Sequence, residues 1–293
     1  MRTFLESLHA TGYDGDVTFF MSRPTEETVV RLATAGVEVS RPKRLRVGFR
    51  GHVFQPYRPK TTRIRWHVQP LYRHVVRALA ALAPDRRAAS MELTGAISNI
   101  DVARHFWYYR YLWRVLPRYR NVMLTDVRDV VFLGSPFDFE VGDDVHFFLE
   151  HDRYRIGDQV NNRGWIAGAY GEDALRELAD RPISCAGVTI GAARAVLGYL
   201  AVTTEHLTRL ARQFHGMDQG IHNYVIHNGL VPRTRFHGNH DGPVLTLGLM
   251  TDDEAAALVA ERGAEAKVVH QYDRHPSLVR MFAGGDFPVT AAR

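Results

Sequence analysis

The segment Val122-Met-Leu-Thr-Asp-Val-Arg-Asp-Val-Val-Phe132 places two acids between two apolar runs. Its first half has the pattern of a buried strand that ends at Asp126, and Asp129 precedes the second run. In open α/β sheets ligands sit beyond the carboxyl ends of strands, and Mg²⁺ and Mn²⁺ prefer carboxylate oxygens. The pattern therefore predicts an α/β protein that holds a divalent cation at Asp126 and Asp129. The alternative is an acidic turn in which Arg128 is a local ion-pair partner.

The sequence around this segment alternates between strand-like and helix-like patterns. Further strand-like runs lie at 17–20, 37–39, 145–149, 185–190, 244–247 and 267–270. Helical patterns lie at 3–9, 25–36, 71–82, 100–116, 174–178, 192–214, 218–227 and 253–262. Such alternation predicts a mostly parallel central sheet flanked by helices. No linker or internal repeat interrupts it, so we expect one domain over residues 1–293.

Length and composition narrow the class of protein. A chain of 293 residues with 45% apolar and 24% charged residues can bury a large core. No apolar run reaches the roughly 18 residues needed to cross a membrane, and the N-terminus lacks a signal-peptide pattern. The single cysteine, Cys185, excludes an internal disulfide framework and a cysteine-based zinc cluster. These features predict a soluble, cytoplasmic protein.

The excess of basic residues indicates an anionic partner. The net charge is +5, and the stretch from Lys43 to Arg65 carries eight Lys and Arg residues and no acid, with aromatic residues between them. A basic loop of this kind binds phosphorylated small molecules, membrane surfaces or nucleic acids. It matches no nucleic-acid-binding motif, so nucleic acid is the less favoured partner. A merely solvated basic surface is the alternative.

Three motifs follow the acid pair along the chain: Ser184-Cys-Ala-Gly-Val-Thr-Ile-Gly191, Met217-Asp-Gln-Gly220 and Val269-His-Gln-Tyr-Asp-Arg-His275. In this order they resemble the GT-A glycosyltransferases, and among these the retaining, glycogenin-like members. The resemblance covers residues 101–275. It implies a Rossmann-like GT-A domain in which residues 1–150 bind the nucleotide and residues 151–293 bind the sugar and the acceptor.

The resemblance also implies roles for particular residues. Asp126, Asp129 and His270 would bind Mn²⁺ or Mg²⁺, and Asp218 and Gln219 would contact the sugar. The nucleotide diphosphate would be contacted by Asp126 and by the basic side chains of Arg104, Arg110 and Arg128. The indole rings of Trp107 and Trp165 offer faces for a sugar ring.

Two departures from the family pattern matter. The acids are spaced D-x-x-D rather than D-x-D, which makes Asp129 the firmer metal ligand and allows Asp126 to contact ribose or to act through water. The family also opens with a strand that cradles the base, whereas this chain opens with a helix at 3–9. We therefore expect either an apolar strand encoded upstream of Met1 or a base site built in another way.

Taken with the resemblance, the sequence predicts a metal-dependent glycosyltransferase. It would move a sugar, with retention of configuration, from a UDP- or GDP-linked donor to an unidentified acceptor. One alternative is a sugar-phosphate nucleotidyltransferase, which needs a Gly-rich phosphate loop that we do not find after the first strand. The other is a non-catalytic module that binds sugar or nucleic acid. The sequence has no G-x-S-x-G, Walker or G-x-G-x-x-G motif, which disfavours hydrolases, NTPases and dehydrogenases.

Overall fold

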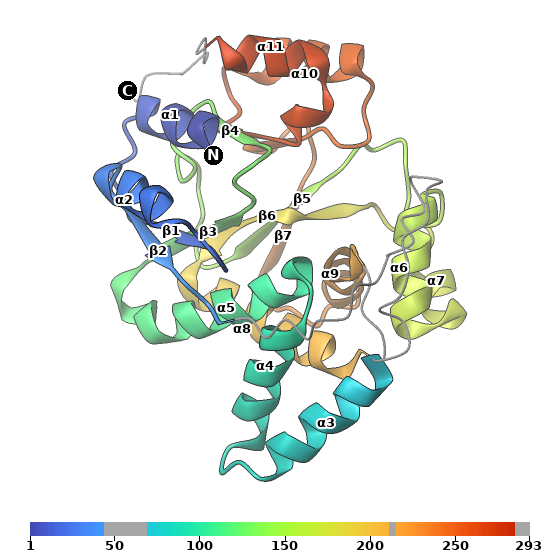
Figure 1. Cartoon of the computed structure of the whole chain (residues 1–293). Coiled ribbons are helices and arrows are strands. Elements are labelled where there is room, and N and C mark those ends of the chain that lie inside the picture. Colours follow the sequence, from blue (N-terminus) through green and yellow to red (C-terminus); the bar gives the residue numbers. More distant parts are fainter. Residues whose placement is uncertain (44–68, 211–214, 285–293) are drawn as a thin grey trace.

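The computed structural model describes residues 1–43, 69–210 and 215–284 (Figure 1). The basic stretch that follows Lys43 lies outside the described residues. The described helices are α1 Arg2–Ala10, α2 Glu26–Thr34, α3 Gln69–Ala81, α4 Arg86–Ile97, α5 Ile100–Val115, α6 Val160–Tyr170, α7 Glu172–Leu178, α8 Ala193–Arg209, α9 Met217–His227, α10 Asp252–Arg262 and α11 Pro276–Ala283. The described strands are β1 Val17–Phe20, β2 Val37–Ser40, β3 Asn121–Thr125, β4 Val130–Phe132, β5 Val145–Leu149, β6 Ser184–Ala192, β7 Thr234–His237, β8 Val244–Thr246 and β9 Val268–His270.

These strands form three small sheets, with the orders β1-β2, β3-β6-β5-β7 and β4-β9-β8. The α/β prediction is confirmed, but the expectation of a mostly parallel sheet is wrong. β6 runs antiparallel to both of its neighbours, β3 and β5, and β4 runs antiparallel to β9. Only the pairs β1-β2, β5-β7 and β8-β9 are parallel among the described strands. A buried strand has the same apolar run whichever way it runs, so the sequence pattern did not reveal the mixture of parallel and antiparallel pairs.

Local capping explains where several helices begin and end. Thr25 accepts a hydrogen bond from the backbone N–H of Thr28 at the start of α2, and Asn99 accepts one at the start of α5. Such caps contribute about 1 kcal/mol each by satisfying an N–H that the helix leaves free. Gly36, at a φ of +73°, turns the chain from α2 into β2. A capping box formed by Thr251 and Glu254 begins α10.

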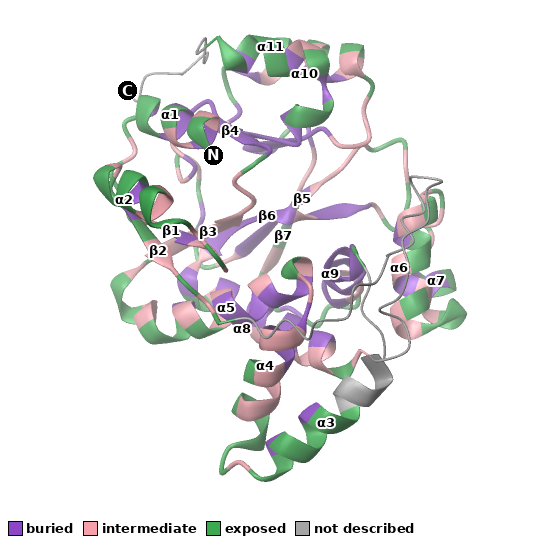
Figure 2. Ribbon diagram, viewed as in Figure 1, coloured by how far each residue is buried: buried purple, intermediate pink, exposed green. Residues whose placement is uncertain are grey.

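The sheet β4-β9-β8 is buried on both faces (Figure 2). On one face Val130, Phe132, Val244 and Val268 share a core with the α1 residues Phe4 and Leu8. On the other face Val131, Leu245 and Val269 share a core with residues of α10 and α11. Because side chains alternate along a strand, Thr246 and His270 lie on the α1 side of this sheet.

The strands β1 and β3 each keep one open edge. Among the described residues β1 pairs only with β2, and β3 pairs only with β6. No backbone hydrogen bond joins β1 to β3 in this part of the chain. The two sheets therefore lie side by side without backbone hydrogen bonds between β1 and β3.

None of the described helices is long and apolar enough to span a bilayer.

Candidate functional site

Three predicted metal ligands converge at the junction of two sheets. Asp126 follows β3, Asp129 directly precedes β4, and His270 ends β9. One ligand atom from each lies within 4.8 Å of the others, and Nε2 of His270 is 3.9 Å from a carboxylate oxygen of Asp129. The pairing of β4 with β9 places Val130 opposite His270 and so fixes Asp129 beside the imidazole. The structure thus brings together the three residues that the sequence analysis singled out.

Gly187 has no side chain, and this leaves room beside it for the side chains of His270 and Asp126. A Cβ atom on Gly187 would lie 2.4 Å from Cε1 and 2.5 Å from Nε2 of His270, and 3.3 Å from a carboxylate oxygen of Asp126. The backbone N–H of Asp126 also donates to the carbonyl of Gly187 over 3.2 Å. A side chain at this position in β6 would therefore occupy the place of a shared ion. The glycine was part of a quoted motif, but its steric role could not be read from the sequence.

The ionisation of the group suits a cation. Burial, with the nearby charges of Asp126 and Asp273, raises the pKa of Asp129 to about 6. Burial lowers the pKa of His270 to about 4, so its imidazole is neutral at pH 7. One carboxylate oxygen of Asp129 and Nδ1 of His270 are buried without a hydrogen-bond partner in the described structure. Buried polar atoms left unpaired cost free energy, and a bound ion would recover part of that cost at Asp129.

Arg104 connects this group to Asp218. From α5 its guanidinium donates to Asp126 over 2.5 Å and to Asp218 over 2.7 Å. Asp218 is buried at the start of α9, where burial raises its pKa and Arg104 opposes that rise. The prediction placed Arg104 near the diphosphate, and it does lie at the site. Its charge, however, is already shared between two carboxylates, so its main effect is to orient them.

Gln219 is engaged with the backbone of β6. Its side-chain oxygen accepts from the N–H of Ala186 over 2.8 Å, and its side-chain nitrogen donates to the carbonyl of Ser184 over 2.6 Å. Asn223, one turn further along α9, donates to the same carbonyl. Gln219 therefore ties α9 to β6, the strand that passes the candidate metal ligands. Both polar atoms of this amide contact β6, and the structure does not test the predicted contact with a sugar.

The other predicted side chains are spread out. Arg110 lies on the exposed surface of α5 and pairs with Glu92 over 2.5 Å, so the structure does not bring it to the acid pair. Arg128 is 81% exposed and pairs with Asp273 over 3.3 Å, next to the site but turned towards solvent. Trp165 is half-buried and packs closely over Gly216, which caps α9, and over Gly220 within α9. Trp107 is buried along the wall of a cavity.

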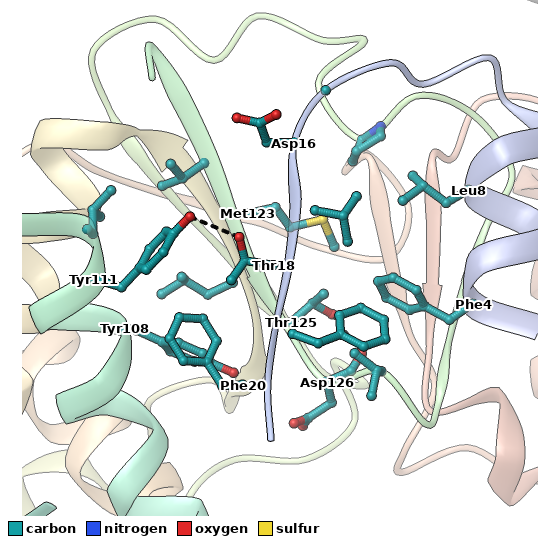
Figure 3. Close-up of a pocket in the computed structure, with 18 of the residues that line it drawn as sticks. Phe4, Leu8, Asp16, Thr18, Phe20, Tyr108, Tyr111, Met123, Thr125 and Asp126 are labelled. Carbon is teal, nitrogen blue, oxygen red and sulfur yellow. Dashed lines mark hydrogen bonds between the residues drawn. The ribbon is translucent and has the colours of Figure 1, made fainter. Parts of the chain in front are cut away.

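That cavity has a volume of about 660 Å³ and lies between α1, β1, α5 and β3 (Figure 3). Figure 3 shows Phe4 and Leu8 on one side of β1, Phe20 and Tyr108 on the other, and Asp126 at one end. The lining is mainly aromatic and aliphatic. The cavity could not be predicted from local sequence patterns, because two segments about 80 residues apart in the chain, α1-β1 and α5-β3, form it together.

The polar side chains around the cavity are largely paired with one another. The hydroxyls of Thr18 and Tyr111 lie 3.0 Å apart, and Tyr111 donates to Glu38. Tyr119 donates to Asp16 over 2.6 Å. The side-chain oxygen of Asn121 is buried without a partner, and the edges of β1 and β3 that pair with no other described strand offer backbone N–H and C=O groups to a bound molecule. The strand β1 lines the cavity although the helix α1 precedes it in the chain, in contrast to the family pattern, in which a strand comes first.

A further carboxyl, the half-buried Glu150, lies beside Cys185 near the candidate metal ligands. Glu150 follows β5, and burial raises its pKa to about 7 against the opposing charge of Arg274. It neighbours Cys185, whose sulfur accepts a hydrogen bond from Gln271 over 3.6 Å. Gln271 adopts a φ of +67°, which is uncommon for a residue other than glycine. Nothing in the sequence pattern pointed to Glu150.

Comparisons with protein-family models and with curated proteins found no match to this chain. The function must therefore be argued from the geometry of the site.

Proposed function

We propose that the protein is a metal-dependent glycosyltransferase that uses a nucleotide-diphosphate sugar as donor. The observation that carries the proposal is the convergence of Asp126, Asp129 and His270 at one end of a large, aromatic-lined cavity. The order of motifs along the chain, which resembles the GT-A glycosyltransferases, is independent support.

The charges at the site favour a divalent cation. Asp126, Asp129 and Asp218 supply three carboxylates, and Arg104 supplies one guanidinium within hydrogen-bond distance. His270 is neutral at pH 7 and offers a nitrogen lone pair. The group therefore has an excess of negative charge when Asp129 is ionised. Two carboxylates and an imidazole are suitable ligands for Mn²⁺ or Mg²⁺.

The cavity suits a nucleotide. Its volume of about 660 Å³ falls within the range of pockets that bind small molecules and cofactors. Aromatic walls stack on a planar ring, and the open edges of β1 and β3 provide hydrogen-bonding groups for the edge of that ring. Asp126 lies at one end of the cavity. A base held between the strands would thus direct its diphosphate towards the metal ligands.

Different residues would bind the cation, orient its ligands and keep the helices in place during the transfer. A cation bound here would supply Lewis-acid stabilisation of the negative charge that develops on the leaving diphosphate. Asp129 and His270 would hold it from the β4-β9 pair, and Arg104 fixes the carboxylate of Asp126 against that of Asp218. Gln219 keeps α9 against β6 and so maintains this arrangement. Retention of configuration is the outcome that the glycogenin-like motif order favours.

The proposal is tested by the binding and hydrolysis of UDP-, GDP- and dTDP-sugars, each with and without Mn²⁺. We expect a rise in melting temperature with at least one sugar nucleotide that requires Mn²⁺, together with slow release of the nucleoside diphosphate. Asp129→Ala should lose both effects while remaining folded. The matched control is Asp173→Ala, which removes an exposed acid paired with Arg176 on α7. Binding without any release of diphosphate would instead indicate a non-catalytic binding module.

A further inference from the structure

Two buried polar atoms on neighbouring strands have no hydrogen-bond partner within the described residues. They are Nδ1 of His270 and the side-chain hydroxyl oxygen of Thr246. Thr246 is fully buried, and His270 is 1% exposed. Each such atom loses its hydrogen bonds to water on folding, and this loss destabilises the folded chain. An arrangement that keeps two of them side by side suggests that they become paired in another state of the protein.

The two residues occupy matching positions. Thr246 lies opposite His270 in the parallel pair of β8 and β9, and neighbouring strands are about 4.8 Å apart. Both belong to the face of the sheet that carries Val244 and Val268, as the alternation along each strand requires. The backbone N–H of Thr246 donates to the side-chain oxygen of Asn239 over 2.7 Å, and the side-chain nitrogen of Asn239 donates to the carbonyl of Thr246 over 3.1 Å. The hydroxyl therefore stands beside the imidazole on a rigid strand.

Metal binding determines which imidazole nitrogen needs a partner. Nε2 of His270 faces Asp129 and the space kept open by Gly187. If Nε2 binds the ion, the ring hydrogen must be on Nδ1. Histidine ligands almost always donate that hydrogen to an acceptor, which fixes both the tautomer and the orientation of the ring. A threonine hydroxyl is a suitable acceptor because its oxygen has lone pairs and its own hydrogen can rotate away.

We propose that Thr246 is a positioning residue, which accepts the Nδ1 hydrogen of His270 and so holds Nε2 towards the cation. This inference rests on the proposed metal site and adds a residue that lies outside it. It also explains why a buried threonine is present where valine, which has nearly the same shape, would leave no polar group unpaired.

The test compares Thr246→Val with Thr246→Ser in the full chain. Mn²⁺ affinity is measured by calorimetry, and folding is measured by melting temperature. We expect Thr246→Val to weaken Mn²⁺ binding by about 10- to 100-fold, the range typical for loss of such a partner. Its melting temperature without metal should be unchanged or higher. Thr246→Ser, which keeps the hydroxyl, should bind Mn²⁺ to within about threefold of the original chain, well short of the loss expected for valine.

A second measurement reports on the histidine itself. Nitrogen-15 NMR distinguishes the two imidazole tautomers. At a Mg²⁺ concentration that just saturates the original chain, we expect His270 to carry its hydrogen on Nδ1 in that chain, whereas the weaker-binding Thr246→Val is only partly loaded and should show a mixture of tautomers. Thr203→Val, which removes another buried hydroxyl, on α8, is the matched control and should leave Mn²⁺ affinity unchanged.

The possible outcomes separate this inference from the proposed function. If the original chain binds no Mn²⁺ or Mg²⁺, the metal site fails and this inference fails with it. If the original chain binds Mn²⁺ and Thr246→Val binds it equally well, only the role of Thr246 is overturned. A fall in both melting temperature and affinity that serine does not restore would show a purely structural role, and it would also overturn the inference.

Discussion

Gly187→Ala should remove cation binding without unfolding the protein. The new methyl carbon would lie 2.4 Å and 2.5 Å from two ring atoms of His270, about 1 Å closer than an ordinary van der Waals contact. It would also lie 3.3 Å from Asp126. The methyl group would therefore enter the space between the ligands, where the ion is expected.

The size of the effect follows from how little the surroundings can move. His270 is 1% exposed and is paired on both sides by β4 and β8, so its ring must shift inside a packed sheet. Overpacking of this kind costs about 1–3 kcal/mol. Gly187 does not need a left-handed backbone, so alanine should recover roughly 0.4–1 kcal/mol from the unfolded chain. The net loss of stability should be about 2.6 kcal/mol or less.

The loss of Mn²⁺ affinity should be on the order of 100-fold or more, at least as large as the loss caused by removing a partner of a histidine ligand. Calorimetry with Mn²⁺ and chemical denaturation measure the two quantities separately. Gly198→Ala is the matched control, because a Cβ atom at that position in α8 would contact nothing within 4 Å. It should leave Mn²⁺ binding intact. If folded Gly187→Ala bound Mn²⁺ as tightly as the original chain, the ion could not lie among Asp126, Asp129 and His270.

Three further outcomes are expected. Asp129→Asn should lose Mn²⁺ binding yet melt at a higher temperature without metal at pH 8, because burial raises the pKa of Asp129 to about 6 and its charge is costly there. Glu150→Gln should be more stable than the original chain by up to about 3 kcal/mol above pH 7. The pKa of Glu150 rises from 4.5 in the unfolded chain to about 7 in the folded chain, so the original chain loses this stability as the pH rises between those values. Denaturation at pH 4.5 and at pH 8 would measure the difference. Arg104→Met should destabilise the fold by about 3–5 kcal/mol by leaving two carboxylates unpaired, whereas Arg110→Met, which breaks an exposed pair with Glu92, should cost less than about 1 kcal/mol in the same denaturation assay.

Much of the secondary structure could be predicted from local patterns, because caps and apolar periodicity act within a few residues. The helix at 25–36 is an example, with Thr25 and Gly36 at its ends. The helices α4, α6 and α11 and the strand β7 were missed. α6 carries two glycines and the indole of Trp165, and β7 has a half-exposed polar pattern, so neither has a clear period.

The candidate site was predicted in part. Asp126, Asp129 and His270 stand at the ends of apolar strands, and that position is visible in the sequence. The engagement of Arg104 and Gln219 with other protein groups depends on how α5 and α9 pack against β6. Such contacts join residues that are far apart in the chain. They depend on the direction of each strand, and a buried apolar run does not indicate that direction.

The open edges of β1 and β3 bear on the solubility of the protein. A strand edge that is not hydrogen-bonded is a template for pairing with another chain, and β1 and β3, whose second edges have no partner in the described part of the chain, both line the aromatic cavity. A molecule held in the cavity would shield both edges at once. We therefore expect the empty protein to aggregate on storage or mild heating faster than the protein saturated with a cavity ligand, as light scattering would measure.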